Sequence, residues 1–210
     1  FLYACKHAQN FDGTLSILMT SDEEGEGTYG TIKMLEHLKQ IDMIPQYAVV
    51  AEPTCEEVFG DAIKVGRRGS INGYITIKGK QGHAAYPEKC INPVHNFAEV
   101  LPKIAGHNLD DGDEYFAPSK MVITDIRGGT QVTNVTPDNL KLMFNVRNST
   151  NTTREKVEEF IHQNLDGFEY DFYTTQRSFP FVTNKESKVV KAMENSIKEI
   201  TEVTTKHSTA

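Results

Sequence analysis

Apolar and polar positions follow different spacings before and after residue 64 of this 210-residue chain. In the first part, Phe1–Gln9 predicts the tail of a helix, and the short apolar run Leu15–Thr20 predicts a buried strand. Helical spacing over Thr28–Ile41 and the apolar run Tyr47–Val50 then predict a helix and a second buried strand. A strand, a helix and a strand in this order indicate a right-handed βαβ crossover, which brings the carboxyl ends of both strands to one edge of a sheet.

From residue 64 on, strict alternation predicts strands, and helical spacing predicts the helices between them. The expected strands are Ile71–Ile77, Met121–Ile126, Leu140–Arg147 and Phe168–Phe172. One helix is expected to begin at Asn92 and Pro93 and to kink or end at Pro102. A second helix is expected to begin at a capping box that runs from Thr152 to Glu155.

The order of these elements indicates how the chain divides into domains. The order β-α-β-β-α-β is that of a ferredoxin-like domain. We predict such a domain over residues 64–177, inserted between two pieces of another domain, residues 1–63 and 178–210. The last piece contains a helix with Val190 and Ile197 on its apolar face, which should return to the first domain.

Composition and charge narrow the class of protein further. A hydrophobic content of 38% and a charged content of 24% are ordinary for a globular protein, and no apolar run approaches a membrane span. The net charge of -7 argues against a nucleic-acid or anionic-membrane partner, so we expect a small-molecule substrate. The three widely spaced cysteines predict free thiols, and the lack of a signal-peptide pattern predicts a cytoplasmic location. The chain opens on Phe1 rather than Met, which indicates a piece of a longer protein.

Acidic residues follow both strands predicted in the first part. Asp22, Glu23 and Glu24 come directly after the first strand, and Glu52 follows the second. Because the carboxyl ends of these strands share one edge of the predicted sheet, we expect Glu23, Glu24 and Glu52 to converge there. Carboxylates at that density favour a bound cation or a shared proton. The alternative is a solvated acidic turn that precedes the helix.

Six short motifs of this chain resemble those of the M20 family of di-zinc amidohydrolases. They are T-S-D-E-E-G from Thr20, A-E-P-T from Ala51, K-V-G-R-R-G-S from Lys64, G-x-Q-G-H-x-A-Y-P from Gly79, N-P-V-H from Asn92 and F-N-V-R from Phe144. The G-R-R-G-S and Q-G-H-x-A-Y-P motifs are the most specific, because many amidases and carboxypeptidases of the family share the acidic motif. The resemblance runs over essentially the whole chain.

The resemblance implies an α/β fold class, in which part of a zinc-peptidase-like α/β catalytic domain carries an inserted ferredoxin-like α+β (βαββαβ) dimerisation domain, here residues 64–177. It also implies two zinc ions per active site, with cobalt as an alternative in one position. By position in the motifs, Glu24 and Glu52 match ligands of the two zinc ions, and Glu23 matches the general base. Zinc ions of this kind polarise the scissile amide and activate a water molecule.

The resemblance further implies roles for residues of the insert. His83, which alone would be read as a surface histidine, matches one that the partner subunit's inserted domain supplies to stabilise the oxyanion, and Asn134 matches a second residue that reaches across the same interface. Arg67, Ser70 and Arg147 match positions that hold substrate carboxylates. The alternative for the arginines is a surface salt bridge worth at most about 1 kcal/mol. Arg147 is expected among inward-facing strand residues, where an unpaired guanidinium would be costly.

The implied activity is zinc-dependent hydrolysis of N-succinyl-LL-2,6-diaminopimelate, on the route to lysine and peptidoglycan precursors. Deacetylation of acetylornithine or another M20 amidase reaction is the alternative within the family, and a non-catalytic dimerisation module is the alternative outside it. The family's upstream H-x-D histidine, bridging aspartate and C-terminal histidine have no counterpart here, so this chain should bind zinc weakly and be inactive alone. We expect a homodimer through the insert, with the helix after Asn92 and the strand Met121–Ile126 at the interface.

Overall fold

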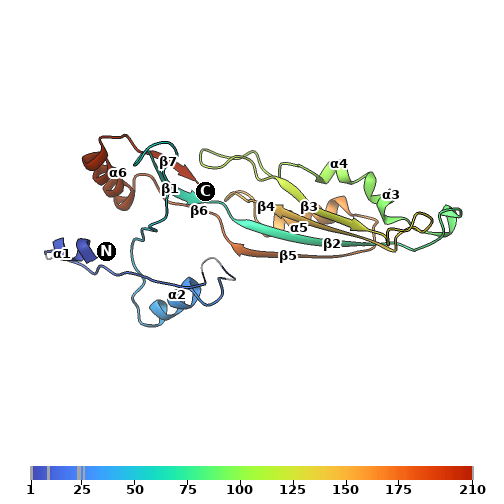
Figure 1. The fold of residues 1–210 in the computed structure, drawn as a ribbon, viewed down its shortest axis with the longest axis horizontal. Coiled ribbons are helices and arrows are strands. Elements are labelled where there is room, and N and C mark those ends of the chain that lie inside the picture. Colours follow the sequence, from blue (N-terminus) through green and yellow to red (C-terminus); the bar gives the residue numbers. More distant parts are fainter. Residues whose placement is uncertain (1, 9, 23–24, 26, 210) are drawn as a thin grey trace. The chain divides into compact units, whose positions relative to one another are not determined.

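The computed structural model describes residues 2–8, 10–22, 25 and 27–209. The chain divides into two compact units, Phe1–Glu52 and Pro53–Ala210. Figure 1 shows the helices and strands of both units. None of the described helices is long and apolar enough to cross a membrane.

The first unit contains helices but no strand among its described residues. Its helices are α1 (Leu2–His7) and α2 (Thr31–Gln40), which lie where the sequence predicts them. The predicted strands Leu15–Thr20 and Tyr47–Val50 are wrong, because neither stretch pairs with another segment in the described part of the chain. The βαβ crossover inferred from these strands is therefore not formed by the described residues.

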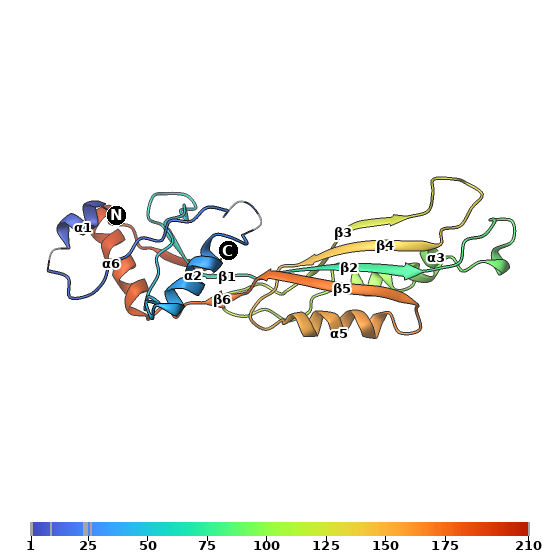
Figure 2. The ribbon, with the colours of Figure 1, turned by 90° about the horizontal axis from the view of Figure 1, so that it is seen from below.

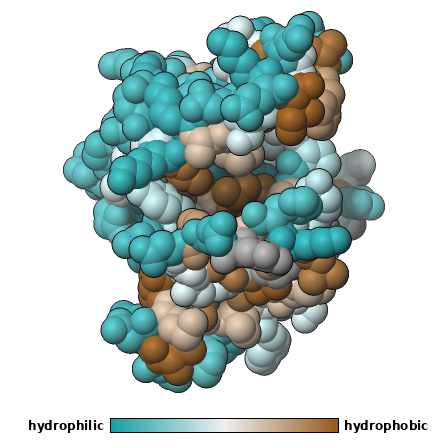
Figure 3. Space-filling model, turned by 90° about the vertical axis from the view of Figure 1, so that its left-hand side faces the viewer, coloured by the Kyte–Doolittle hydropathy of each residue, from teal (hydrophilic) through white to brown (hydrophobic). Residues whose placement is uncertain are grey.

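The apolar side chains of those two stretches are exposed rather than buried. Met19 is 81% exposed and Val50 is 77% exposed. Figure 3 shows apolar side chains at the surface on the face that it draws. An apolar run forms a buried strand only when neighbouring strands accept its hydrogen bonds and other elements cover its two faces. The described residues of this unit provide no neighbouring strand, so the hydrophobic pattern alone does not produce a sheet.

The second unit contains two sheets, and the smaller has three strands in the order β6-β1-β7. The elements of this part are β1 (Ala62–Arg67), β6 (Phe181–Val182), β7 (Lys206–Thr209) and the helix α6 (Lys188–Thr201), which connects β6 to β7. β1 runs antiparallel to β6 and parallel to β7. α6 has the predicted apolar face, with Val190 buried, and it belongs to the second unit.

The larger sheet has four strands in the order β3-β4-β2-β5, and every neighbouring pair is antiparallel. These strands are β2 (Ser70–Lys78), β3 (Met121–Gly128), β4 (Asn139–Val146) and β5 (Tyr170–Ser178). Figure 2 shows them side by side in this order. Together with the connecting helices the chain follows β-α-β-β-α-β, so the ferredoxin-like arrangement predicted from the sequence is confirmed. β3 and β5 are the two edge strands of this sheet.

Helices cover one face of the larger sheet. The connections contain η1 (Pro87–Lys89), α3 (Pro93–Ala98) and α4 (Leu101–Ile104) between β2 and β3, and α5 (Arg154–Asn164) between β4 and β5. Asn92 caps α3, because its side chain accepts a hydrogen bond of 3.0 Å from the backbone N–H of Val94. α3 has already ended before Pro102, which lies in the first turn of α4. That turn has no internal acceptor for its N–H groups and therefore tolerates proline.

The start of α5 differs from the prediction by one residue. The side chain of Thr153, rather than that of Thr152, accepts a hydrogen bond of 3.3 Å from the backbone N–H of Lys156. Thr152 is buried, and its hydroxyl donates to the carboxylate of Asp110. The capping box predicted to begin at Thr152 is therefore wrong, because the Thr152 hydroxyl is hydrogen-bonded to Asp110 instead of to the start of the helix.

The inward-facing apolar residues that alternate along β2 and β4 pack against the helices and form the core of this domain. The buried residues of this core include Ile71, Ile75, Ile77, Phe97, Ile104, Leu140, Leu142, Phe144, Val146, Val157, Ile161 and Leu165. Fully burying a side chain of this size contributes about 1.5–3 kcal/mol. β2 contributes Gly73 where the ring of Phe144 crosses it, and a Cβ atom there would lie 2.0 Å from that ring. Because this core is packed along the sheet, the two ends of the sheet keep fixed positions relative to each other.

Candidate functional site

The acidic residues predicted to hold metal lie in the first unit. Glu23 and Glu24 fall outside the described residues, and so does their predicted convergence with Glu52. Glu52 itself is exposed on an irregular segment. Zinc in proteins normally takes four donors, with histidine nitrogen or cysteine sulfur among them. Within the described residues no three His, Cys, Asp or Glu side chains lie close enough to hold a metal ion, so this part of the chain does not fit a complete zinc site.

Asp22, the first acid of the same cluster, has a local structural role. Its carboxylate accepts hydrogen bonds from the backbone N–H groups of Thr28, at 2.8 Å, and Tyr29, at 3.1 Å. Its own carbonyl accepts from the N–H of Gly27 at 3.1 Å. These contacts close the turn that precedes α2, which supports the turn interpretation for Asp22 alone.

Three of the predicted site residues lie at one end of the larger sheet. Arg67 ends β1, Ser70 begins β2, and Arg147 follows β4. The register of β2 and β4 pairs Ile71 with Val146, which makes Ser70 and Arg147 neighbours across the two strands. The structure therefore brings this group together in one place, as a group that binds one substrate would require.

The prediction that Arg147 faces inward is wrong. Leu142, Phe144 and Val146 are the buried residues of β4, and Arg147 is the next residue after them. Because successive side chains of a strand point to opposite faces, Arg147 falls on the solvent side and is exposed. The guanidinium therefore carries no desolvation cost, and it is open to a ligand.

The two arginines of the G-R-R-G-S motif have different surroundings. Arg68 donates to the carbonyl oxygens of Arg147, at 3.2 Å, and Ala117, and its guanidinium lies 5.8 Å from the ring centre of Phe116. Arg67 is exposed, and its side chain makes no hydrogen bond or ion pair within the described part of the chain. Arg68 therefore stabilises the fold by joining the segments that contain Ala117 and Arg147. The side chain of Arg67 is available to bind an anion.

A polar cluster that the sequence analysis missed orients Ser70. The side-chain amide of Asn145 donates to the hydroxyl oxygen of Ser70 at 3.0 Å and to the side-chain oxygen of Asn72 at 2.9 Å. The Ser70 oxygen thus has a partner, and its proton is left to donate to a ligand. The signal in the sequence was the position of Asn145 among the outward residues of a strand, inside the F-N-V-R motif.

His83 and Asn134 lie together at the other end of the larger sheet. His83 belongs to the loop of residues 79–92 between β2 and α3, and Asn134 belongs to the loop of residues 129–138 between β3 and β4 (Figure 1). The backbone N–H of Ala84 donates to the carbonyl oxygen of Asn134 at 2.9 Å. Two segments that are far apart in the sequence therefore form one paired structure that carries both predicted residues.

The imidazole of His83 is oriented by its own loop. The backbone N–H of Ala85 donates to its Nδ1 at 3.1 Å, and the N–H of Tyr86 donates to the His83 carbonyl at 2.9 Å. The residue is exposed. A neutral ring whose Nδ1 accepts a hydrogen bond carries its proton on Nε2. The Nε2–H of His83 is therefore the donor that the ring can offer to an oxygen atom of another molecule.

The length of β2 separates the two groups of predicted site residues. β2 contains nine residues, and at about 3.4 Å per residue it spans roughly 30 Å. Arg67, Ser70 and Arg147 lie at its beginning, while His83 and Asn134 lie beyond its end. Within one copy of this unit, the two groups cannot contact the same small molecule.

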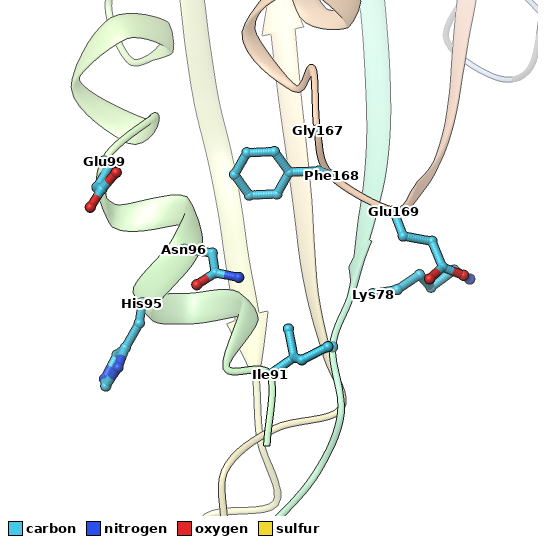
Figure 4. Close-up of a pocket in the computed structure, with 9 residues that line it drawn as sticks. Lys78, Ile91, His95, Asn96, Glu99, Gly167, Phe168 and Glu169 are labelled. Carbon is cyan, nitrogen blue, oxygen red and sulfur yellow. The ribbon is translucent and has the colours of Figure 1, made fainter. Parts of the chain in front are cut away.

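Two open pockets lie beside α3, and neither contains a predicted site residue. One is lined by Lys78, Gly79, Ile91, His95, Asn96, Glu99, Gly167, Phe168 and Glu169. Figure 4 shows that His95 and Glu99 point away from the strands, and Lys78 forms an ion pair with Asp171. The other pocket adjoins the His83 loop and is lined in part by Pro87, Cys90 and Thr136. Neither pocket is lined by a predicted site residue, so the candidate site remains with the two groups at the sheet ends.

Comparison with known families gives the class of protein to which the larger sheet and its helices belong, that of a dimerisation domain. Residues 65–170, half of the chain, match the peptidase dimerisation domain of the M20 family. The chain therefore belongs to the M20 peptidase family. The mixed α/β fold expected from the sequence, with its ferredoxin-like dimerisation domain, is confirmed.

Relatives of known name are similar along the whole chain. The chain is 84% identical over 210 residues to a succinyl-diaminopimelate desuccinylase of Aliarcobacter butzleri, and 61% identical over 210 residues to the protein of that name in Sulfurimonas denitrificans. Both matches cover 100% of this chain, but only 57% and 58% of those proteins. The chain thus spans a little over half the length of the curated relatives it matches.

Solved structures agree on the fold. Human carnosine dipeptidase 1 superposes with a TM-score of 0.62 at 14% identity, over 90% of this chain and 53% of its own. An M20 family metallo-carboxypeptidase from Sulfolobus solfataricus superposes with a TM-score of 0.59 at 15% identity, over 70% of this chain and 53% of its own. At identities this low, the likeness shows the fold alone.

Proposed function

We propose that the complete protein containing this chain hydrolyses N-succinyl-LL-2,6-diaminopimelate to succinate and LL-diaminopimelate. The observation that carries this proposal is the 84% identity over all 210 residues to a protein named succinyl-diaminopimelate desuccinylase. Membership of the family supports only a hydrolase of the M20 type, because the dimerisation domain does not specify a substrate. We assign the reaction to the cytoplasm and to the synthesis of lysine and peptidoglycan precursors.

The proposed catalytic groups of this chain are acidic residues of the first unit. Glu24 and Glu52 would each hold one of two zinc ions, and the remaining ligands would come from parts of the complete protein outside this chain. When bound, the zinc ions polarise the scissile amide and lower the pKa of a water molecule. Glu23 acts as the general base that takes a proton from the attacking water and passes it to the leaving amine.

The basic end of the larger sheet would bind the carboxylates of the substrate. Arg67, Ser70 and Arg147 are neighbours there, both arginines are exposed, and Ser70 is held so that its hydroxyl proton faces no partner in the described residues. Guanidinium groups bind carboxylates through paired, charge-assisted hydrogen bonds. This group positions the substrate and favours acyl groups that end in a carboxylate.

We place His83 and Asn134 in the active site of a second subunit. The roughly 30 Å between the two ends of β2 prevents both groups from serving one substrate within a single copy. A homodimer through the dimerisation domain supplies the second copy. In it, the Nε2–H of His83 donates to the oxyanion that forms when water adds to the amide carbonyl.

Turnover by the complete protein tests the proposed function. We expect succinate release from N-succinyl-LL-2,6-diaminopimelate with kcat/KM on the order of 10⁴ M⁻¹s⁻¹ or more, and at least about 100-fold less for N-acetylornithine, since the site is built to pair a second carboxylate. Chelation should abolish turnover, and added zinc should restore it. A preference for N-acetylornithine would contradict the proposed substrate.

The 210-residue chain alone provides a matched comparison. It supplies only Glu24 and Glu52 as predicted zinc ligands, so we expect weak zinc binding in equilibrium dialysis and no turnover. Tight stoichiometric zinc, or turnover by this chain, would show that the ligand assignment is wrong.

A further inference from the structure

Thr136, in the loop that carries Asn134, forms hydrogen bonds with the loop that carries His83. The Thr136 hydroxyl accepts a hydrogen bond from the N–H of Gly82 at 3.0 Å and donates to the carbonyl oxygen of Gly82 at 3.2 Å. The backbone N–H of Thr136 donates to the same carbonyl at 2.9 Å. Both polar groups of Gly82, the residue directly before His83, are therefore bound to Thr136.

The same segment is packed closely on another side. A Cβ atom at Gly82 would lie 2.7 Å from the Cβ atom of Cys90, so the backbone has no room to move toward that residue. Lys80 and Ile91 close the base of the loop with hydrogen bonds of 2.8 and 3.0 Å between their backbone groups. A loop closed at its base and held next to His83 gives the imidazole a defined position.

We propose that Thr136 is a positioning residue for His83, and that its hydroxyl joins the two loops so that His83 and Asn134 reach the active site as one rigid group. Thr136 acts through Gly82 and need not touch the substrate. The inference rests on the proposed function, because it assigns Thr136 a role in that reaction. An oxyanion donor must hold its geometry closely, since a displacement of about 1 Å can cost on the order of 10²-fold in rate.

The first test compares three variants of the complete protein. Thr136→Val removes the hydroxyl but keeps the shape of the side chain, Thr136→Ser keeps the hydroxyl, and Thr130→Val changes an exposed threonine of the same loop that makes no hydrogen bond in the described part of the chain. We expect Thr136→Val to lower kcat about 10- to 100-fold with KM changed by less than about threefold, because the lost contact serves the transition state. Thr136→Ser should restore kcat to within about threefold of the parent, and Thr130→Val should leave it unchanged.

The second test measures the link between the loops without using activity. Hydrogen–deuterium exchange of the peptide covering residues 79–92 should be about five- to tenfold faster in Thr136→Val, because the N–H of Gly82 loses its acceptor. Exchange in α5 should stay unchanged in all three variants, which shows that the domain remains folded.

The outcomes of the two tests separate the possible errors. Unchanged exchange in Thr136→Val overturns the proposal that the Thr136 hydroxyl joins the two loops. Faster exchange with an unchanged kcat, or a kcat that Thr136→Ser does not restore, overturns the positioning role. If the parent protein does not hydrolyse N-succinyl-LL-2,6-diaminopimelate, the proposed function fails instead, and the exchange result still decides whether Thr136 holds the loop.

Discussion

One backbone contact determines which nitrogen of the neutral His83 ring carries the proton and can act as a donor. The N–H of Ala85 occupies Nδ1, so the neutral ring offers its Nε2–H as a donor. A fixed neutral donor suits an oxygen atom on which negative charge develops, because it needs no rearrangement during the reaction.

A mixed dimer should show whether His83 acts in the neighbouring subunit. In the trans arrangement, a dimer of one Glu23→Gln chain and one His83→Ala chain has one site with both lesions and one site with neither. Each parent variant should lose about 10²–10³ in kcat or more, so recovery toward half of the wild-type activity per mixed dimer is readable. Activity measured after subunit exchange at several mixing ratios gives the result. A titration that never exceeds the weighted mean of the two parents would overturn the assignment.

The reciprocal mixture serves as the control for that experiment. A wild-type chain is mixed with a chain that carries both Glu23→Gln and His83→Ala. In the trans arrangement every site of this mixed dimer has one lesion, so the dimer should be inactive. If His83 serves its own chain, the same dimer should keep half of the wild-type activity.

Among the secondary-structure elements, β3 carries exposed apolar side chains on a sheet edge. It is an edge strand of the larger sheet, and its register with β4 is irregular between Ile123 and Asp125. Val122 is 49% exposed and Ile126 is 44% exposed. Unpaired edge strands promote association unless charges or covering elements protect them. The matched dimerisation domain and this edge together support pairing of β3 with its copy in a second subunit.

A charge on β3 should therefore weaken the dimer. We expect Val122→Glu in the complete protein to raise the dimer dissociation constant at least about tenfold, because it places like charges across the twofold axis and buries a carboxylate. Thr175→Glu, which places the same charge at an exposed position of the opposite edge strand β5, is the matched control. Sedimentation velocity of all three proteins at about 10 µM measures the effect. A parent protein that sediments as a monomer, or equal effects of the two substitutions, would count against β3 as the interface.

The acid stability of the whole molecule should depend on Asp110. Its carboxylate accepts hydrogen bonds from the backbone N–H groups of Gly112, at 2.8 Å, and Ser119, at 3.0 Å. It also accepts from the hydroxyls of Ser149, at 2.7 Å, and Thr152. Burial raises the pKa of Asp110, but the hydrogen bonds from Ser119, Thr152 and Ser149 lower that pKa by more, so it lies well below its ordinary range. The folded state therefore favours the ionised form.

The sign of the pH dependence follows from this lowered pKa. The stabilisation by ionised Asp110 is fully present above the ordinary aspartate pKa of about 4, and it is lost progressively as the pH falls below that value. We expect Asp110→Asn to lower the free energy of unfolding by about 1–3 kcal/mol at pH 7, with a difference that shrinks toward pH 2. Thermal unfolding followed between pH 7 and about 2 measures this. Asp111→Asn, at the exposed neighbouring residue, should behave like the parent, and a constant difference across the pH range would exclude ionised Asp110 as the cause.

Much of the second unit could be predicted because its signals are local. The alternation in β2 and β4, the proline and asparagine at the start of α3, and the order of the elements can each be read within a few residues of sequence. The strands predicted at Leu15–Thr20 and Tyr47–Val50 could not be judged in this way. Their apolar runs meet the local requirement for a strand, but a sheet also needs partner strands, and the described residues of that unit contain none.

The sequence by itself determined the βαββαβ order and the motif residues, because side-chain period, turn residues and residue type are properties of short segments. Only the tertiary structure decided that Arg147 faces solvent, that Thr152 bonds to Asp110 and that Thr136 holds Gly82 beside His83. These contacts join segments that are distant in the chain. Their geometry is set by how the strands and helices pack, and packing leaves no pattern in the residues near each partner.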